Sequence, residues 1–219
     1  RPILTLRVLR NTVEFDKVSN LYDALPFCGY AFRDGPWKDA LIAFDFDPRY
    51  NPRSRIYQTI TLEMSYDPIL APDVVKSMGD KMQISLPYFG AEDDLNSHIF
   101  SGRTIHPESQ IWQIYNITDV LLRRIISTTA LRHRACQKTG FYHNSTIAKI
   151  IIIMRDKLEC LRDGCVASDH YYECLVGMPD IYQPVEGPVS SVSSRCFLPV
   201  GSTYSRKGAF LWSMVRKLA

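Results

Sequence analysis

Histidines and cysteines gather in one stretch of the chain and raise the question of a zinc site. The candidates within these 42 residues are His133, Cys136, His143, Cys160, Cys165, His170 and Cys174. A structural zinc site needs four ligands that converge tetrahedrally, usually from two tight turns. The set contains no Cys-x2-Cys pair, and Cys160 would project from the interior of an apolar helix. We therefore expect scattered core cysteines and no metal.

Other patterns that support catalysis are incomplete. Asp45 and Asp47 would share one face of a strand and could hold Mg²⁺ or Mn²⁺, but no glycine-rich phosphate loop accompanies them. The Asp-Pro-Arg sequence at Asp47 favours a turn with a salt bridge to Arg49. The Gly-x-Ser-x-Gly, P-loop and Gly-x-Gly-x-x-Gly motifs are absent from the sequence. We predict that the protein is not an enzyme and takes no cofactor; a metal-dependent transferase is the alternative, which metal retained after purification would reveal.

Basic side chains interleaved with aromatic ones offer a different chemistry, contact with a nucleic-acid backbone. The first cluster consists of Arg33, Lys38, Arg49, Arg53 and Arg55, with Trp37, Tyr50 and Tyr57 between them. Flexible cations around turns suit contacts to phosphates. A solvated, salt-bridged surface is the alternative, because four aspartates lie in the same stretch. A second cluster consists of Arg123, Arg124, Arg132, Arg134 and Lys138, and its alternative is the outward side of an amphipathic helix.

Composition limits the class of protein. The 219 residues are 46% hydrophobic, with 26 basic and 23 acidic side chains and a net charge of +3, which is typical of a globular domain. Most nucleic-acid binders carry more positive charge. The total hides an uneven distribution, because residues 58–111 carry −5 between flanks of +2 and +5. No apolar run reaches the roughly 18–20 residues of a membrane span, so we expect no membrane partner. At this length and apolar content the six cysteines favour free buried thiols in a reducing compartment, so we expect an intracellular protein. Because the chain starts at Arg1, we expect it to be a piece of a longer protein.

The elements that must position these residues follow from apolar spacing. We predict helices from residue 2 to 13, from residue 16 or 19 to about 28, from residue 118 to 126, from residue 144 or 145 to 161, and from residue 204 to 218. Pro26 implies a kink or a later start for the second helix. Strands are predicted at residues 56–64 and 111–117, with another at 81–88. Residues 179–195 are rich in Pro, Gly and Ser and are predicted to be a linker.

One stretch of the chain carries a motif that is more informative than the charge of its residues. It contains Gly-Pro-Trp-Lys at 35–38, Phe-Asp-Phe-Asp-Pro-Arg at 44–49, a proline at 52 and Ile-Tyr-Gln at 56–58. This arrangement resembles the signature of the TFIIIC subunit family that recognises box A in the tau-A lobe, the general transcription factor 3C polypeptide five family. Arg-Pro at the start, Leu-Pro at 25–26, residues 113–126 and Cys-Phe-Leu-Pro at 196–199 add to the resemblance. Lys38 departs from the family's arginine, which loses bidentate geometry, and Asp45 departs from its glycine.

The resemblance implies an α+β fold, with a winged-helix-like domain, a small antiparallel sheet and a large helical C-terminal extension. We assign residues 1–110 to the winged-helix-like part, with a loop-rich acidic insertion at about 65–110, and residues 111–219 to the helical extension packed against it. The implied function is non-catalytic DNA binding at the box A internal promoter of tRNA genes, in the nucleus, for RNA polymerase III. The implied partners are duplex DNA, other TFIIIC subunits, and TFIIIB or RNA polymerase III. A protein–protein docking module of the same factor, with weak nonspecific DNA binding, is the alternative.

The resemblance also directs attention to particular side chains. We expect DNA-backbone contacts from Arg33, Lys38, Arg49, Arg53 and Arg55, with Arg7 and Arg10 on the first helix as further candidates. We expect Trp37, Phe44, Phe46 and Tyr57 to form a core that fixes their geometry. The second candidate patch consists of Arg123, Arg124, Arg132 and Arg134. Base specificity stays open, because the sequence does not place an element in a DNA groove.

Overall fold

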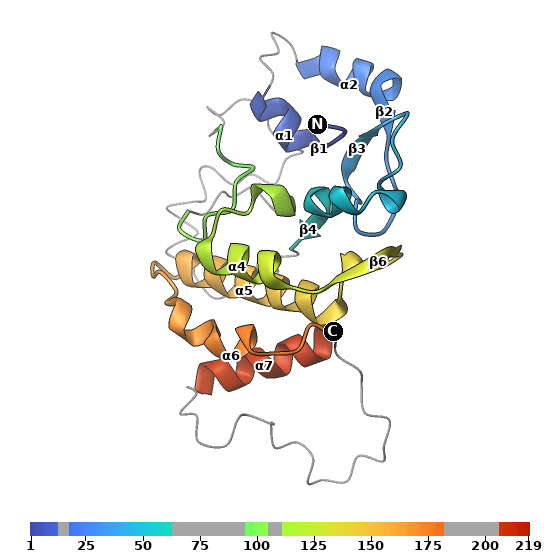
Figure 1. The fold of residues 1–219 in the computed structure, drawn as a ribbon. Coiled ribbons are helices and arrows are strands. Elements are labelled where there is room, and N and C mark those ends of the chain that lie inside the picture. Colours follow the sequence, from blue (N-terminus) through green and yellow to red (C-terminus); the bar gives the residue numbers. More distant parts are fainter. Residues whose placement is uncertain (13–17, 63–94, 105–110, 182–205) are drawn as a thin grey trace.

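A small antiparallel sheet organises the N-terminal part of the chain (Figure 1). The computed structural model describes residues 1–12, 18–62, 95–104, 111–181 and 206–219. The sheet has the order β1-β3-β2, with β1 at Ile3–Thr5, β2 at Gly29–Tyr30 and β3 at Ala40–Ala43. Helices α1 (Leu6–Thr12) and α2 (Val18–Cys28) lie between β1 and β2 in the sequence. The chain order is therefore strand, two helices and a hairpin that returns beside the first strand.

The two faces of this sheet have different neighbours. Ile3 lies opposite Ile42 on one face, and both are fully buried. Leu4 and Leu41 lie opposite each other on the other face and are half-buried. The prediction of a helix from residue 2 is wrong for the first residues, because Ile3 pairs with β3 and α1 begins only at Leu6. The predicted second helix is confirmed, and it continues through Pro26.

Two short 3-10 helices connect the sheet to the rest of the molecule. They are η1 (Pro48–Tyr50) and η2 (Pro52–Tyr57), and strand β4 (Thr59–Thr61) follows and pairs with β5 (Ile111–Gln113). The predicted start of the strand at residue 56 is therefore wrong. Residues 56 and 57 belong to η2, which the Asn51 side chain caps, and β4 begins only at Thr59. The strand predicted at 111–117 ends early, since η3 occupies Ile114–Asn116.

Helices dominate the C-terminal half. Helix α4 (Val120–Thr128) is capped by Asp119, so it begins two residues after the predicted start at 118, and it leads into strands β6 (Leu131–Cys136) and β7 (Gly140–Tyr142). The long α5 (Asn144–Arg162) is followed by η4 (Asp169–Tyr172), α6 (Glu173–Val176) and α7 (Arg206–Leu218). Figure 1 shows α7 packed below α5, where it buries Leu211 and Val215. The β6–β7 hairpin is absent from the sequence prediction.

Two hydrophobic cores meet at β7. The smaller core consists of Ile3, Trp37, Ala40, Ile42 and Phe141. The larger core gathers side chains from β4, β5, α4, α5, α6 and α7, and it includes Tyr142. Neighbouring residues of one short strand therefore complete different cores, with Phe141 1% exposed and Tyr142 fully buried.

The fold class is confirmed as α+β, with helices and small antiparallel sheets. The division at residue 110 stays a prediction, although β4 pairs with β5 across it. Most of the acidic 65–110 insertion, the predicted strand at 81–88 and most of the 179–195 linker lie outside the described residues. None of the helices in the described part of the chain is long and apolar enough to span a membrane.

Candidate nucleic-acid interface

The loop between β2 and β3, residues 31–39, carries two of the predicted contact residues. Arg33 and Lys38 are both exposed. The loop turns at Gly35, whose φ of +98° favours glycine, and the Lys38 N–H donates to the Gly35 carbonyl over 3.1 Å. Trp37, only 2% exposed, anchors the loop by donating its Nε1 proton to the Ser54 carbonyl over 3.2 Å. The two cations thus project from a turn whose backbone is fixed.

Arg49 is held by Asp47 rather than left free. The Asp47 side chain caps η1 by accepting the Arg49 N–H over 2.9 Å. The Arg49 guanidinium also donates from Nε and Nη2 to both carboxylate oxygens, at 2.7 to 3.1 Å, and it lies 5.3 Å from the centre of the Phe32 ring. The side-chain hydrogen bonds from Arg49 hold the pKa of Asp47 below its ordinary value. A phosphate would have to compete with this carboxylate, so Arg49 offers less free charge than its position suggests.

The arginines of η2 differ in exposure. Arg53 is exposed, and its backbone N–H donates to the Asn51 side chain over 3.0 Å. Arg55 is half-buried, and its Nη1 donates to the Pro52 carbonyl over 3.2 Å. The 3-10 turn therefore presents Arg53 to solvent most openly. Three exposed cations of the first cluster form no ion pair with a carboxylate in the described part of the chain. They are Arg33, Lys38 and Arg53.

The cations of α1 are less exposed than Arg33, Lys38 and Arg53. Arg7 and Arg10 are half-buried. Arg7 donates to the Ser97 hydroxyl over 3.4 Å, and Asn11 on the same helix donates to that hydroxyl over 3.0 Å. Helix α1 thus packs against the segment around Ser97. DNA contact by Arg7 and Arg10 stays a prediction.

The second predicted cluster divides between two elements. Arg123 and Arg124 lie exposed on α4, opposite the buried Leu121, Leu122 and Ile125, which is the outward side of an amphipathic helix. Arg132, Arg134 and Lys138 lie on the β6–β7 hairpin. Figure 1 shows β6 projecting from the helical half toward the side of the molecule that carries β3.

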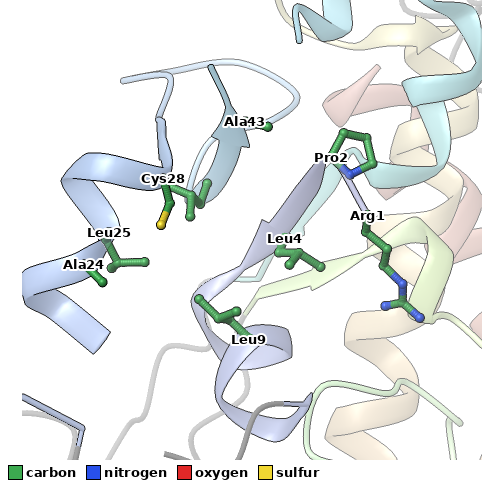
Figure 2. Close-up of a pocket in the computed structure, with 9 residues that line it drawn as sticks. Arg1, Pro2, Leu4, Leu9, Ala24, Leu25, Cys28 and Ala43 are labelled. Carbon is green, nitrogen blue, oxygen red and sulfur yellow. The ribbon is translucent and has the colours of Figure 1, made fainter. Parts of the chain in front are cut away.

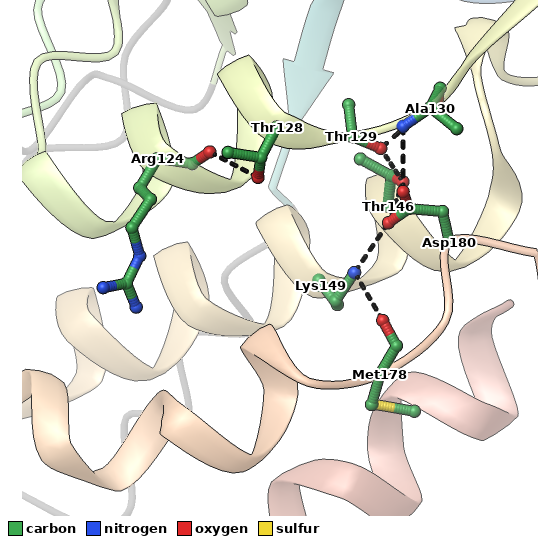
Figure 3. Close-up of polar contacts among 8 residues, drawn as sticks. All are labelled: Arg124, Thr128, Thr129, Ala130, Thr146, Lys149, Met178 and Asp180. Carbon is green, nitrogen blue, oxygen red and sulfur yellow. Dashed lines mark hydrogen bonds and ion pairs between the residues drawn. The ribbon is translucent and has the colours of Figure 1, made fainter.

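The junction between α4 and β6 is fixed by polar contacts (Figure 3). The Asp180 carboxylate accepts the Ala130 N–H over 2.9 Å and the Lys149 ammonium over 2.8 Å. Lys149 also donates to the Met178 carbonyl over 3.0 Å, and the hydroxyls of Thr129 and Thr146 lie 2.7 Å apart. Figure 3 also shows the Arg124 guanidinium well away from this cluster. The buried Lys149 therefore holds the base of the hairpin and is not available to DNA.

One aromatic prediction is wrong. Trp37 is buried and Phe46 and Tyr57 pack against the smaller core, as expected. Phe44, however, is 58% exposed. It follows the end of β3 directly, where the chain turns toward Asp47 and no longer alternates between the two sheet faces.

The His, Cys, Asp and Glu side chains of the described residues are scattered. No three His, Cys, Asp or Glu side chains in the described ranges are placed to hold a metal ion. Asp47 caps a turn and binds Arg49, as predicted.

A groove of about 260 Å³ lies between α2 and the face of the sheet that carries Leu4 and Leu41 (Figure 2). Its lining is apolar apart from Arg1 and Cys28: Arg1, Pro2, Leu4, Leu9, Ala24, Leu25, Cys28, Leu41 and Ala43. Such a groove suits an apolar side chain rather than a polar substrate.

The first 63 residues contain the helix pair α1 and α2 and the β2–β3 hairpin, whose loop bears exposed cations. Residues 1–63 match the family "RNA polymerase III transcription factor (TF)IIIC subunit HTH domain". The chain is 25% identical over 169 residues to "Transcription factor tau subunit sfc1" of Schizosaccharomyces pombe, covering 77% of this chain and 32% of that protein. It is 37% identical over 62 residues to human "General transcription factor 3C polypeptide 5", covering 27% of this chain and 11% of that protein. These matches confirm the resemblance to the TFIIIC subunit family of general transcription factor 3C polypeptide 5.

A solved structure supports the same fold. "Sfc1-DBD" superposes with a TM-score of 0.64 at 23% sequence identity, covering 83% of this chain and 78% of that structure. The likeness extends well beyond the 63 residues of the family match, so it includes much of the helical half. The chain spans about a third of the length of the S. pombe relative.

Proposed function

We propose that this chain is a DNA-binding domain of an RNA polymerase III general transcription factor subunit and contributes to recognition of the box A promoter of tRNA genes. The observation that carries the proposal is the set of exposed cations, Arg33, Lys38 and Arg53, on turns anchored by Trp37 and Asn51. All of them lie within the segment that matches the TFIIIC helix-turn-helix family. The role is non-catalytic and nuclear, with duplex DNA, other TFIIIC subunits, and TFIIIB or RNA polymerase III as partners.

The order of elements supports a winged-helix arrangement. In this arrangement α2 is the second helix of the helix-turn-helix, and the β2–β3 loop is the wing. Helix α2 contains neither Lys nor Arg, so it cannot supply cations to the phosphates. The wing and η2 must therefore supply most of the electrostatic attraction in this part of the molecule, and modest affinity for the isolated chain follows.

A salt titration tests the proposal. Each phosphate neutralised contributes about −0.9 to the slope of log affinity against log salt concentration. Replacement of Lys38 and Arg53 with Glu should weaken binding to a tRNA-gene duplex and make the slope shallower. Arg103→Glu with Lys217→Glu is the matched control, because both are exposed cations outside the two basic clusters and the change in charge is the same. A slope near zero for the unmodified chain contradicts DNA binding, and equal footprints on box A and on a scrambled sequence contradict box A recognition.

A second candidate function rests on a separate observation. The groove beside α2 has an apolar lining that includes Cys28 and Ala43, and the residues next to these two in sequence, Phe27 and Phe44, are 83% and 58% exposed. An apolar groove and exposed aromatic side chains are typical of protein-binding surfaces. This surface supports a docking module within the same transcription factor. Binding of the chain to purified TFIIIC subunits, with only weak DNA binding that does not depend on sequence, would favour this alternative.

A further inference from the structure

We propose that the β6–β7 hairpin is a second DNA-contacting element, and that the buried side chain of Gln58 fixes it beside the first. The inference rests on the proposed DNA-binding function. It assigns a role to a part of the chain that lies far outside the segment matched by the helix-turn-helix family.

The charge of this region suits a polyanion. The 36 residues from 120 to 155 contain seven Lys or Arg residues and no Asp or Glu. Within the hairpin, Arg134 and Lys138 are exposed and Arg132 is half-buried, its Nε donating to the Tyr142 carbonyl over 3.4 Å. The nearby Asp180 is already bound to the Ala130 N–H and to Lys149 at the base of the hairpin. The outer part of the hairpin is therefore complementary to phosphates.

The hairpin is tied to η2 and β4 by one side-chain amide. Gln58 is 1% exposed and lies between η2 and β4, where both of its sequence neighbours are half-buried. Its Nε2 donates to the Thr139 carbonyl over 3.0 Å, and its Oε1 accepts the Phe141 N–H over 2.9 Å. The pairing of β6 with β7 is irregular between Leu131 and Cys136. An amide that satisfies two backbone groups of the turn compensates for hydrogen bonds that an irregular ladder cannot make.

Gly140 makes this close approach possible. Its φ is +62°, and a Cβ at this position would collide with the side-chain amide of Gln58. Phe141, the next residue, packs against Trp37 with ring centres 6.2 Å apart. Trp37 is the residue that anchors the wing. The hairpin and the wing therefore share one rigid support.

The tips of the two elements also meet. A Cβ at Gly35, in the middle of the wing, would lie 2.9 Å from the carbonyl oxygen of Gln137, in the turn of the hairpin. Arg33 and Lys38 flank Gly35 in sequence, and Arg134 and Lys138 flank Gln137. The exposed cations of two distant segments therefore flank one point where the wing and the hairpin approach each other. We infer that they form one surface, and DNA bound along this surface would contact both elements.

Salt titrations of the full chain with a tRNA-gene duplex test the inference. Arg134→Ala with Lys138→Ala should make the log–log slope shallower by about 0.9 for each phosphate that the hairpin no longer neutralises. Arg103→Ala with Arg162→Ala is the matched control, because it removes the same charge from exposed positions outside both basic clusters, and it should leave the slope nearly unchanged. Equal effects of the hairpin pair and the control pair would overturn the hairpin's special role.

A variant of the wing separates this inference from the proposed function. If Lys38→Ala with Arg53→Ala makes the slope shallower and the hairpin pair does not, the inference fails and the proposed function stands. If no pair changes the slope, the proposed function fails as well. If both pairs change it, both proposals are supported.

The role of Gln58 needs its own measurement, because Gln58 is a positioning residue. In a Gln58→Leu background, the hairpin pair should have less effect on the slope, and hydrogen exchange at the Phe141 amide should accelerate. An unchanged exchange rate and an unchanged effect would overturn the assignment. Should Gln58→Leu fail to fold, Gln58→Glu keeps the acceptor for Phe141 and loses the donor to Thr139. The same two readouts then apply to that variant.

Discussion

Lys157 is a buried cation, and its replacement tests how much a buried ion pair contributes to the stability of the fold. It lies on α5 with 4% of its side chain exposed, and its ammonium contacts Asp119 at 2.5 Å and Asp169 at 2.7 Å. Asp119 is 7% exposed on its side chain, whereas Asp169 is 53% exposed. Asp119 also caps α4 by accepting the Leu122 N–H over 3.0 Å.

The expected cost of Lys157→Met follows from these exposures. Loss of one member of a buried ion pair costs about 3–5 kcal/mol, because the other charge stays buried without its partner. The exposed Asp169 contributes at most about 1 kcal/mol. Because Asp119 keeps its hydrogen bond from Leu122, we expect a loss near the lower end, about 3 kcal/mol. This is a large part of the roughly 5–15 kcal/mol that stabilises a typical domain.

A double variant distinguishes the cost of leaving the Asp119 carboxylate buried and unpaired from the cost of losing the packing of the Lys157 side chain. Lys157→Met combined with Asp119→Asn buries no charge and keeps a capping oxygen, so it should recover stability to within about 1 kcal/mol of the unmodified chain. Urea unfolding followed by circular dichroism measures both variants, and Arg123→Met, on the exposed face of α4, is the control. A loss below about 1 kcal/mol for Lys157→Met, or no recovery in the double variant, would refute the reasoning.

Three further predictions concern other buried groups. Phe141→Ala should cost about 3–5 kcal/mol in urea unfolding and should change the fluorescence of Trp37, against which it packs; unchanged fluorescence would contradict that packing. Burial raises the pKa of Asp180, but hydrogen bonds from Lys149 and a backbone N–H outweigh it and leave the pKa below its ordinary 3.8. The carboxylate therefore stabilises the fold above about pH 4 and loses this effect as the pH falls, and Asp180→Asn should flatten that acid decline. Burial raises the pKa of Tyr142 to about 12, so stability should fall as the pH rises from 10 toward 12, and Tyr142→Phe should remove this part of the decline.

The sequence predicts best where local chemistry decides the structure. Helix α5 begins at Asn144 and ends at Arg162, close to the prediction. Its apolar stripe has helical spacing, and Gly164 beyond it takes a φ of +76°. The capping of η1 by Asp47 was also predictable, because Asp-Pro-Arg is a local signal that needs no distant partner.

The arrangement of the candidate site could not be predicted in the same way. Both basic clusters are visible in the sequence, but their proximity depends on hydrogen bonds between Gln58 and residues 81 and 83 positions away. The sequence of β6, Leu-Arg-His-Arg-Ala-Cys, has no clear alternation of apolar and polar residues, because all of it is exposed or half-buried. The burial of Gln58 is visible only in the structure, and its place in the Ile-Tyr-Gln motif at 56–58 is the one sequence signal that could have drawn attention to it.

The division of Phe141 and Tyr142 between two cores has a consequence for synthesis on the ribosome. The helix-turn-helix segment ends near residue 63, yet its core contains Phe141. A nascent chain that has emerged only to residue 63 lacks both this ring and the partners of Gln58. The segment therefore cannot finish packing until some 80 further residues have been translated, and a truncated 1–63 fragment should expose Trp37 and aggregate. The folding unit of this molecule is thus longer than its helix-turn-helix segment.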